Sequence, residues 1–236
     1  KMTLPKNYTY AEYAREGFFQ LLFVCLLNLV IVSVCLYFFK KHTALKVILT
    51  VISLCTYIMI ASSAMRMILY IQAYHLSFLR IGVLWSLFVI LLLMTGITVS
   101  IYKTAFPLVR FSLITLTACY LLLSFSHQDY WIAKYNLSVT DSENGVDYYY
   151  LKNLSADAAP AILAPDVLHR YRSNKYSGTD PNGSWINYYV RWQLEPQIEK
   201  MNIRNFNLSV NQAKKMVASM QAGVPVPDAD AAATGR

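Results

Sequence analysis

The stretch GFFQLLFVCLLNLVIVSVCLYFF, residues 17–39, decides the class of fold because it holds no charged side chain along its whole length. A helix needs about 20 apolar residues to cross a hydrocarbon core about 30 Å thick. This stretch meets that requirement and is predicted to cross a membrane as a helix. Its two amides are Gln20 near the start and Asn28 near the middle. We expect Asn28 to form an interhelical hydrogen bond rather than to bind a ligand.

Three further apolar runs follow, at about residues 44–65, 81–102 and 106–126. The short connectors KKHT and KTAFP join the first run to the second and the third to the fourth, so these pairs are expected to be antiparallel neighbours. Gly96 is expected to let two helices approach closely. We therefore predict an all-α fold: a four-helix transmembrane bundle over residues 17–126, with both chain ends on one side of the membrane.

Between the second and third runs lies RMILYIQAYHLSFLR, residues 66–80, which brings Arg66, Gln72 and Arg80 into an apolar region. The two arginines are fourteen residues apart, and a helical repeat places them on one face, about 21 Å apart. Apolar and aromatic residues follow helical spacing on another face: Met67, Tyr70, Ile71, Tyr74, Phe78 and Ile81. The pattern predicts an amphipathic connector helix over 66–80.

Three placements of this connector helix are open. It lies flat at the interface with its arginines toward lipid headgroups. Alternatively, it extends the second or third span and directs the arginines at the C-terminal region. In the third placement the arginines are buried in the bilayer, which makes them functional candidates by default. Arg66, Gln72, Arg80 and Asn28 are accordingly candidate interaction residues.

The composition supports a membrane protein that anchors to anionic lipid. Hydrophobic residues make up 56% of the chain and charged residues 14%, whereas soluble domains carry about a quarter. The whole net charge of +8 arises in residues 1–126, which favours lipid headgroups over nucleic acid as the partner. Basic residues are divided almost evenly between the two sides of the bundle, so the sequence does not predict which side faces the cytoplasm.

After residue 126 the chain becomes polar. We expect an interfacial N-terminal segment at 1–16, a helical extramembrane region at 127–220 and a disordered tail at 221–236 whose last residues are typical of an appended sequence. Pro196 is expected to kink or divide one helix of this region, and Ser209 to cap another. The predicted membrane-interface anchors are Tyr130, Trp131, Tyr135, Lys40 and Lys41.

Residues with catalytic potential are sparse. His127 and Asp129 form the one close His/Asp pair near a membrane exit, but two residues apart they point in different directions on a helix. Cys25, Cys35, Cys55 and Cys119 all lie in apolar runs and are expected to be small buried hydrophobes. We predict no catalytic residue, no metal site and no cofactor, and we retain His127 and Asp129 as candidate interaction residues.

Several strings together resemble one bacterial multi-pass membrane family: YTYAEYAREGFFQLL (8–22), ASSAMRMILYIQAYHLSFLR (61–80), DYWIAKYNL (129–137), YLKNLSADAAPAIL (150–163) and FNLS (206–209). That family is known as a domain of unknown function, series four-one-seven-three, and is related to series four-one-five-three. The resemblance implies a polytopic protein with a helical tail and with further membrane helices upstream. It implies no activity or cofactor. Family members commonly have a proline where this chain has Gln128.

Three functions follow as hypotheses. The first is a non-enzymatic component of a bacterial envelope system in the cytoplasmic membrane, acting as scaffold, sensor or accessory subunit with a protein partner or a second copy of itself. The alternative is part of a transporter or channel, completed by further helices or by oligomerisation, in which Asn28, Gln20 and the arginines line the pathway. The least favoured is an enzyme acting on a lipid-linked substrate through His127, Asp129 and Arg80.

Overall fold

The structure of the chain is a computed structural model that describes residues 10–39, 42–103, 105–139, 147–172, 184–202 and 206–221. All regular secondary structure in these described ranges is helical, which confirms the all-α class. The chain forms two compact units, Lys1–Ser126 and His127–Arg236, here called the membrane unit and the C-terminal unit.

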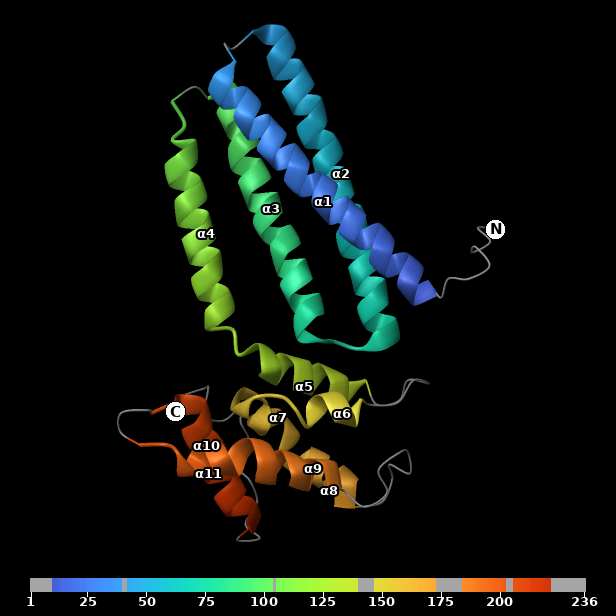
Figure 1. Cartoon of the computed structure of the whole chain (residues 1–236), viewed down its shortest axis with the longest axis vertical. Helices are drawn as coiled ribbons and strands as arrows, with labels where there is room; N and C mark the ends of the chain where they lie inside the picture. Colours follow the sequence, from blue (N-terminus) through green and yellow to red (C-terminus); the bar gives the residue numbers. More distant parts are fainter. Residues whose placement is uncertain are drawn as a thin grey trace. The chain divides into compact units, whose positions relative to one another are not determined.

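The membrane unit contains four long helices, α1 (Tyr10–Phe38), α2 (Thr43–Tyr74), α3 (Phe78–Tyr102) and α4 (Leu108–Ser124). Helices α1, α2 and α3 pack against one another in pairs, and α4 lies along α3 (Figure 1). Helix α3 is the central element, since it contacts each of the other three.

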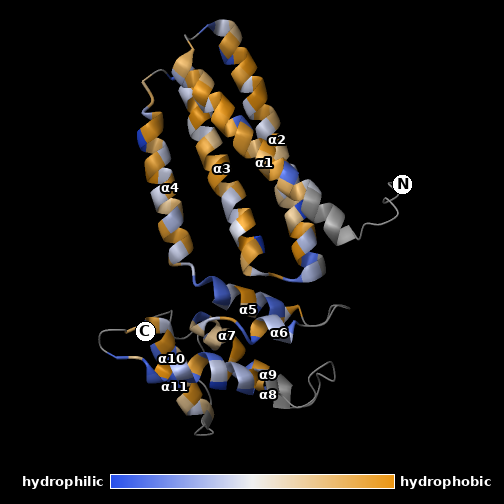
Figure 2. Cartoon of the chain, in the orientation of Figure 1, coloured by the Kyte–Doolittle hydropathy of each residue, from blue (hydrophilic) through white to orange (hydrophobic). Residues whose placement is uncertain are grey.

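Apolar side chains cover these helices along most of their length (Figure 2). In the described part of the chain, three segments are long and apolar enough to cross a membrane: Gly17–Phe38, Thr43–Gln72 and Phe78–Tyr102. Helix α4 has 17 residues and reaches the required length only when joined across a break to the next helix, so the count is three spans or up to four. The protein therefore has the helices of a membrane protein, and its fourth span stays a prediction.

Buried residues recur every seven positions on α1 and about every 3.5 positions on α2 and α3, which is the spacing of left-handed helix packing. On α1 the buried positions are Phe18, Cys25 and Val32; on α2 they are Leu49, Ser53, Thr56, Ile60, Ser63, Met67 and Ile71; on α3 they are Val83, Leu87, Ile90, Met94, Gly96, Ile97 and Ile101. Small serine and threonine side chains on α2 allow close approach of neighbouring helices, as is common in membrane interfaces.

The prediction of a separate amphipathic connector helix over 66–80 is wrong, whereas the alternative placement, in which the segment extends the second or third span, agrees with the helices. Helix α2 continues without a break to Tyr74, and α3 begins at Phe78, so the segment is divided between two antiparallel helices. The turn occurs at His75, whose φ of 64° is in the left-handed region, and Ser77 precedes α3 in extended conformation. The apolar residues keep helical spacing across this turn by coincidence. The spacing of side chains along the sequence does not indicate where the backbone reverses.

The N-terminal segment predicted at 1–16 is divided in the same way. Helix α1 already begins at Tyr10, ahead of the apolar span, while residues 1–9 lie outside the described part of the chain.

The C-terminal unit consists of short helices. In order they are α5 (Gln128–Ser138), α6 (Tyr148–Leu151), the 3₁₀ turn η1 (Ala156–Ala158), α7 (Ala159–Ile162), α8 (Pro165–Arg172), α9 (Ser184–Tyr188), the π-helical segment η2 (Tyr189–Leu194), α10 (Glu195–Glu199) and α11 (Leu208–Gln221). Helix α5 packs on η1 and α7, and α11 packs on η1, α7, η2 and α10. Fully buried side chains at the centre include Ile132, Leu151, Ile162, Tyr189 and Leu194.

Proline and capping side chains set the breaks between these helices. Pro196 lies in the first turn of α10 and separates it from η2, as its missing N–H predicts. The predicted Ser209 cap is wrong: Asn207 caps α11 by accepting a hydrogen bond from the Ser209 backbone N–H at 2.9 Å. Either residue type suits a cap, so composition alone did not separate them. The tail after Gln221 lies outside the described residues.

Candidate functional site

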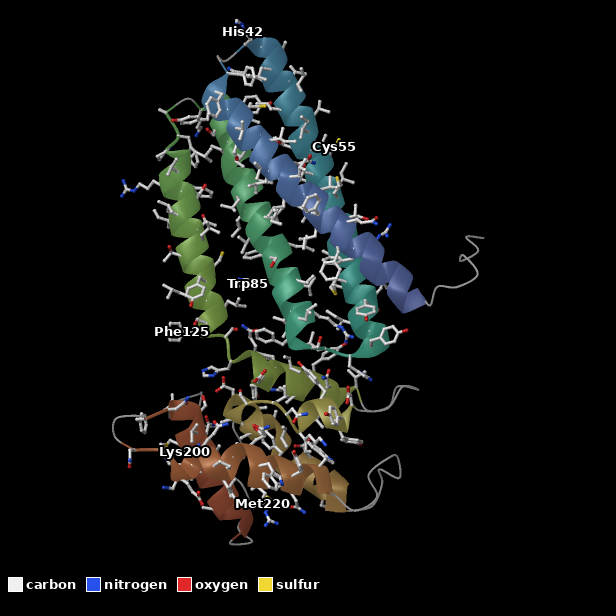
Figure 3. All side chains as sticks on the ribbon, in the orientation of Figure 1. His42, Cys55, Trp85, Phe125, Lys200 and Met220 are labelled. Carbon is white, nitrogen blue, oxygen red and sulfur yellow. The ribbon has the colours of Figure 1, made fainter. Side chains whose placement is uncertain are left out.

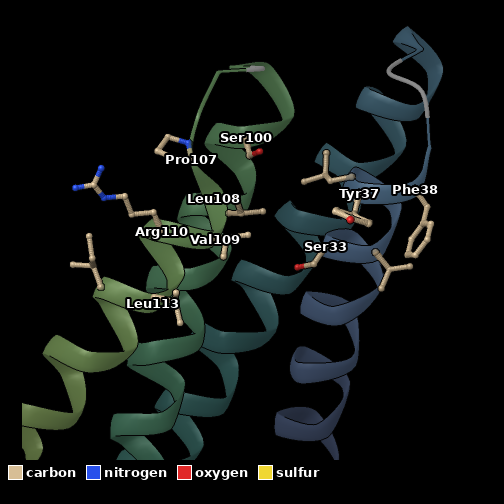
Figure 4. Close-up of a pocket in the computed structure, with 12 residues that line it drawn as sticks. Ser33, Tyr37, Phe38, Ser100, Pro107, Leu108, Val109, Arg110 and Leu113 are labelled. Carbon is tan, nitrogen blue, oxygen red and sulfur yellow. The ribbon is translucent and has the colours of Figure 1, made fainter.

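The membrane unit has a groove between α1 and α4 with α3 beside it, about 1260 Å³ in volume (Figure 4). We call it the α1–α4 groove. It is lined by Ser33, Val34, Leu36, Tyr37, Phe38, Ser100, Pro107, Leu108, Val109, Arg110, Leu113 and Ile114.

The α1–α4 groove is mainly apolar and open. Its walls include Tyr37 with 83% and Val109 with 73% of their surface exposed. The Ser33 hydroxyl donates to the Leu29 carbonyl oxygen at 2.7 Å, so it is satisfied within its own helix. The Arg110 side chain extends away from α1 (Figure 4). The groove therefore offers a mainly apolar wall to an occupant. The guanidinium of Arg110 lies outside the space between α1 and α4 (Figure 4).

Helix α4 is held on α3 by a close contact at Gly96. A Cβ atom built on Gly96 would lie 2.3 Å from a ring carbon of Phe111, a distance that real atoms do not tolerate. The ring of Phe111 therefore occupies the space that a side chain at position 96 would take. This confirms the expectation that Gly96 allows close helix approach.

Polar side chains within the membrane unit bond between helices. The Asn28 amide on α1 donates to the Thr56 hydroxyl on α2 at 3.1 Å, as the sequence predicts. Tyr57 and Thr98 hydroxyls lie 2.9 Å apart and connect α2 to α3. These bonds satisfy groups that would be costly to leave unpaired in lipid. Gln20, by contrast, is exposed on α1.

The hairpin between α2 and α3 brings Arg66 and Arg80 to one cavity of about 220 Å³, which we call the arginine pocket. Its full lining is Phe18, Phe19, Arg66, Met67, Tyr70, Ser77, Leu79 and Arg80. The separation of about 21 Å expected for one straight helix does not apply, because the two arginines lie on successive antiparallel helices. Gln72 is exposed on α2 and lies outside this lining.

In the C-terminal unit, His127 and Asp129 bind different partners. The His127 Nδ1 lies 3.5 Å from the Asp157 Oδ2, and Asp129 accepts a hydrogen bond from the Ser155 backbone N–H at 3.0 Å. His127 has a φ of 45°, in the left-handed region, and its imidazole faces Asp157 rather than Asp129. Both contacts fasten the start of α5 to η1 and to Ser155, the residue that precedes it.

Tyr189 completes this cluster from the opposite end of the unit. Its hydroxyl donates to the Ser155 carbonyl oxygen at 2.6 Å, and the residue is fully buried. Burial raises the pKa of the Tyr189 phenol, and the carboxylates of Asp129 and Asp157 raise it further. The phenol therefore stays protonated and serves as a donor. The sequence pointed to His127 and Asp129 but assigned no site role to Asp157, Ser155 or Tyr189. Ser155 and Asp157 lie in the string YLKNLSADAAPAIL, whereas Tyr189 lies outside it.

The predicted interface anchors are partly described. On α5, Trp131 is 56% exposed and Tyr130 is half-buried. The Lys134 ammonium lies 5.4 Å from the centre of the Tyr130 ring and 5.9 Å from that of Trp131. Tyr135 is half-buried on the same helix. Lys40 and Lys41 lie outside the described residues, and membrane contact by all five stays a prediction.

Metal-ligating side chains do not cluster among the described residues, where no group of three His, Cys, Asp or Glu side chains is found. The four cysteines are free thiols: Cys25 and Cys119 are buried, Cys35 is half-buried and Cys55 is exposed on α2 (Figure 3). Their burial is thus less uniform than expected.

A family model described as Domain of unknown function (DUF4153) matches residues 1–164, which span the membrane unit and the C-terminal unit as far as α7. This is the related series named in the sequence resemblance. No curated protein and no solved structure matches the chain.

Proposed function

The chain belongs to the DUF4153 family of membrane-type helical proteins, and from this premise we propose that it is a non-enzymatic subunit of a bacterial envelope assembly. In this role it is a multi-pass protein of the cytoplasmic membrane. It associates laterally with a transmembrane helix of a partner protein and carries the C-terminal unit as an accessory module.

The observation that carries this proposal is the α1–α4 groove. A helix 10–12 Å across that rises 5.4 Å per turn fills on the order of 500 Å³ per turn, so about two and a half turns match the groove of 1260 Å³. Ser33 and Ser100 in its lining are the small residues that favour close helix contact in membranes. Apart from Tyr37 and Arg110, the remaining lining is apolar and suits the side chains of a transmembrane helix.

The polar groups of the membrane unit support a subunit more than a transport pathway. Asn28, the candidate for a pathway, donates to Thr56 and so is occupied in holding α1 to α2. A pathway through the membrane unit would need polar groups directed at a water-filled space, whereas the groove walls are apolar.

The cluster around His127 likewise supports a structural role. Its members bind one another across α5, η1 and η2, and the Tyr189 phenol holds its proton. A general base needs a pKa near the working pH and has to reach the proton that it removes from the substrate. The side chains of this cluster instead bind one another and hold the short helices together.

A site-specific photocrosslink tests the proposal. Leu113 in the α1–α4 groove and Leu54 on α2 are both leucines with 60% of their surface exposed, and Leu54 lies outside the groove lining. We expect an aliphatic diazirine residue close to leucine in size at position 113, activated in intact membranes, to form a covalent protein adduct, while the same residue at position 54 labels lipid. An adduct of two copies of this chain would identify the partner as a second copy. Lipid labelling alone at both positions would refute the proposal.

A further inference from the structure

We propose that the arginine pocket binds the phosphate group of an anionic phospholipid, with the acyl chains toward the apolar side of the pocket. This site is separate from the α1–α4 groove: it joins the first turns of α3 to the last turns of α2, whereas the groove lies at the start of α4. The inference does not depend on the proposed partner helix.

Arg66 lies level with the start of the apolar span of α1. A Cβ atom on Gly17 would lie 3.2 Å from Arg66 Nη1, so this guanidinium lies against the backbone of α1. Gly17 is also the residue at which the apolar span of α1 begins. Arg66 is therefore placed at the depth where the hydrocarbon region gives way to headgroups, which is where phosphates lie.

The guanidinium of Arg80 is held in place at the C-terminal end of α2. Its Nη1 donates to the carbonyl oxygens of Tyr74 and His75 and so closes the C-terminal end of α2. The guanidinium carbon lies 4.6 Å from the centre of the Tyr70 ring. These contacts fix the orientation of the guanidinium. Among the described residues no hydrogen bond uses its Nε or Nη2 groups, so these N–H donors of the planar fork can meet a ligand.

The described lining of the arginine pocket is positively charged. Two guanidinium groups line one pocket, and no described carboxylate lines it or pairs with either arginine. Charge-assisted bonds from arginine to phosphate are geometrically favourable because the fork matches two phosphate oxygens. The Ser77 side chain adds a hydroxyl to the same lining.

The apolar side chains of the arginine pocket favour a lipid over a free anion. Phe18, Phe19, Met67 and Leu79 complete the lining, and Phe19 and Leu79 are 45% and 62% exposed. A free phosphate would leave Phe19 and Leu79 uncovered, whereas a phospholipid covers them with its acyl chains while its phosphate meets the arginines.

The experiment is native mass spectrometry of the full chain released from detergent micelles with added dioleoyl phosphatidylglycerol. We expect the first phosphatidylglycerol to bind more tightly than dioleoyl phosphatidylcholine. Arg66→Ala should weaken that first binding at least about five-fold, the effect of about 1 kcal/mol per arginine near anionic lipid. Leu79→Glu, which leaves both arginines intact and adds a negative charge at the pocket, should weaken it as well.

The matched control is Lys103→Ala, which removes an exposed cation at the other end of α3 and should leave the first affinity unchanged. Equal affinities for the native chain and Arg66→Ala would overturn the proposal, as would equal losses in Arg66→Ala and Lys103→Ala. Displacement of the first lipid by millimolar inorganic phosphate would assign the pocket to a free anion and overturn the lipid source.

Discussion

Tyr189 links three short helices of the C-terminal unit through one hydroxyl. It donates to the Ser155 carbonyl oxygen, and Ser155 in turn donates its backbone N–H to Asp129. The buried phenol has a raised pKa, so its neutral form is favoured by folding. The stability that this provides is complete below the unfolded pKa of about 10 and is lost as the pH rises above it.

Tyr189→Phe should therefore lower the free energy of unfolding by about 1–3 kcal/mol at pH 8, because the Ser155 carbonyl loses its partner. Above about pH 10 the native chain should lose stability faster than the variant, by up to about 1.4 kcal/mol per pH unit. Urea unfolding followed by circular dichroism at several pH values measures both. A gap between the two proteins that stays constant or widens above pH 10 would contradict this account.

Gly96 is the residue on which the α3–α4 contact depends. Gly96→Ala forces the Phe111 ring to move and should destabilise the membrane unit by about 1–3 kcal/mol, as overpacking does. Gly82→Ala in the same helix is the control, because a Cβ atom there meets nothing within 4 Å. A thiol-reactive dye reports unfolding as buried Cys25 and Cys119 become exposed on heating, with Cys35 and Cys55 replaced by alanine. Equal melting temperatures for the two glycine variants would refute the contact.

Single residues were predictable from the sequence where the local alternatives were few. The Asn28 hydrogen bond and the role of Gly96 followed from the cost of unpaired amides in lipid and from the need for small residues at helix contacts. The partners of His127 and Asp129 were not predictable, because Asp157 and Ser155 approach them only through tertiary packing.

At the scale of elements, the apolar runs located the long helices, but their ends were less certain. The second span was predicted to end at residue 65, but helix α2 continues for nine more residues, to Tyr74. The polar residues Arg66 and Gln72 are exposed and do not stop a helix. The reversal at His75 depends on a left-handed backbone angle and on Arg80 closing the helix end. Neither feature has a reliable one-dimensional signature.

Spin labels can distinguish the hairpin from the straight helix that the periodicity predicts. Labels at Arg66→Cys and Leu79→Cys, in a chain without its four native cysteines, should show strong dipolar broadening because both positions line one pocket. A straight helix would separate them by about 20 Å. Labels at Leu79→Cys and Leu92→Cys, also thirteen residues apart but both on α3, provide the reference for that separation. Identical spectra for the two pairs would restore the straight-helix interpretation.

At the scale of the whole molecule, composition predicted a membrane protein with a polar helical region after it. In the described ranges of the chain, three helices, or up to four, are long and apolar enough to cross the membrane. The α1–α4 groove was not predictable, since it depends on how far α4 stands from α1 when Gly96 and Phe111 hold it to α3. Hydropathy records which side chains avoid water, and it gives no information on which of them face lipid and which face a partner.

The mass of the complex extracted from membranes with a lipid-retaining polymer tests the proposed subunit role most directly. The account predicts a mass above the 26.9 kDa of one chain for the native protein and for Leu54→Trp. Leu113→Trp, which fills the α1–α4 groove, should shift that complex to the single chain. A single chain in all three samples, or an assembly that Leu113→Trp leaves intact, would contradict the account.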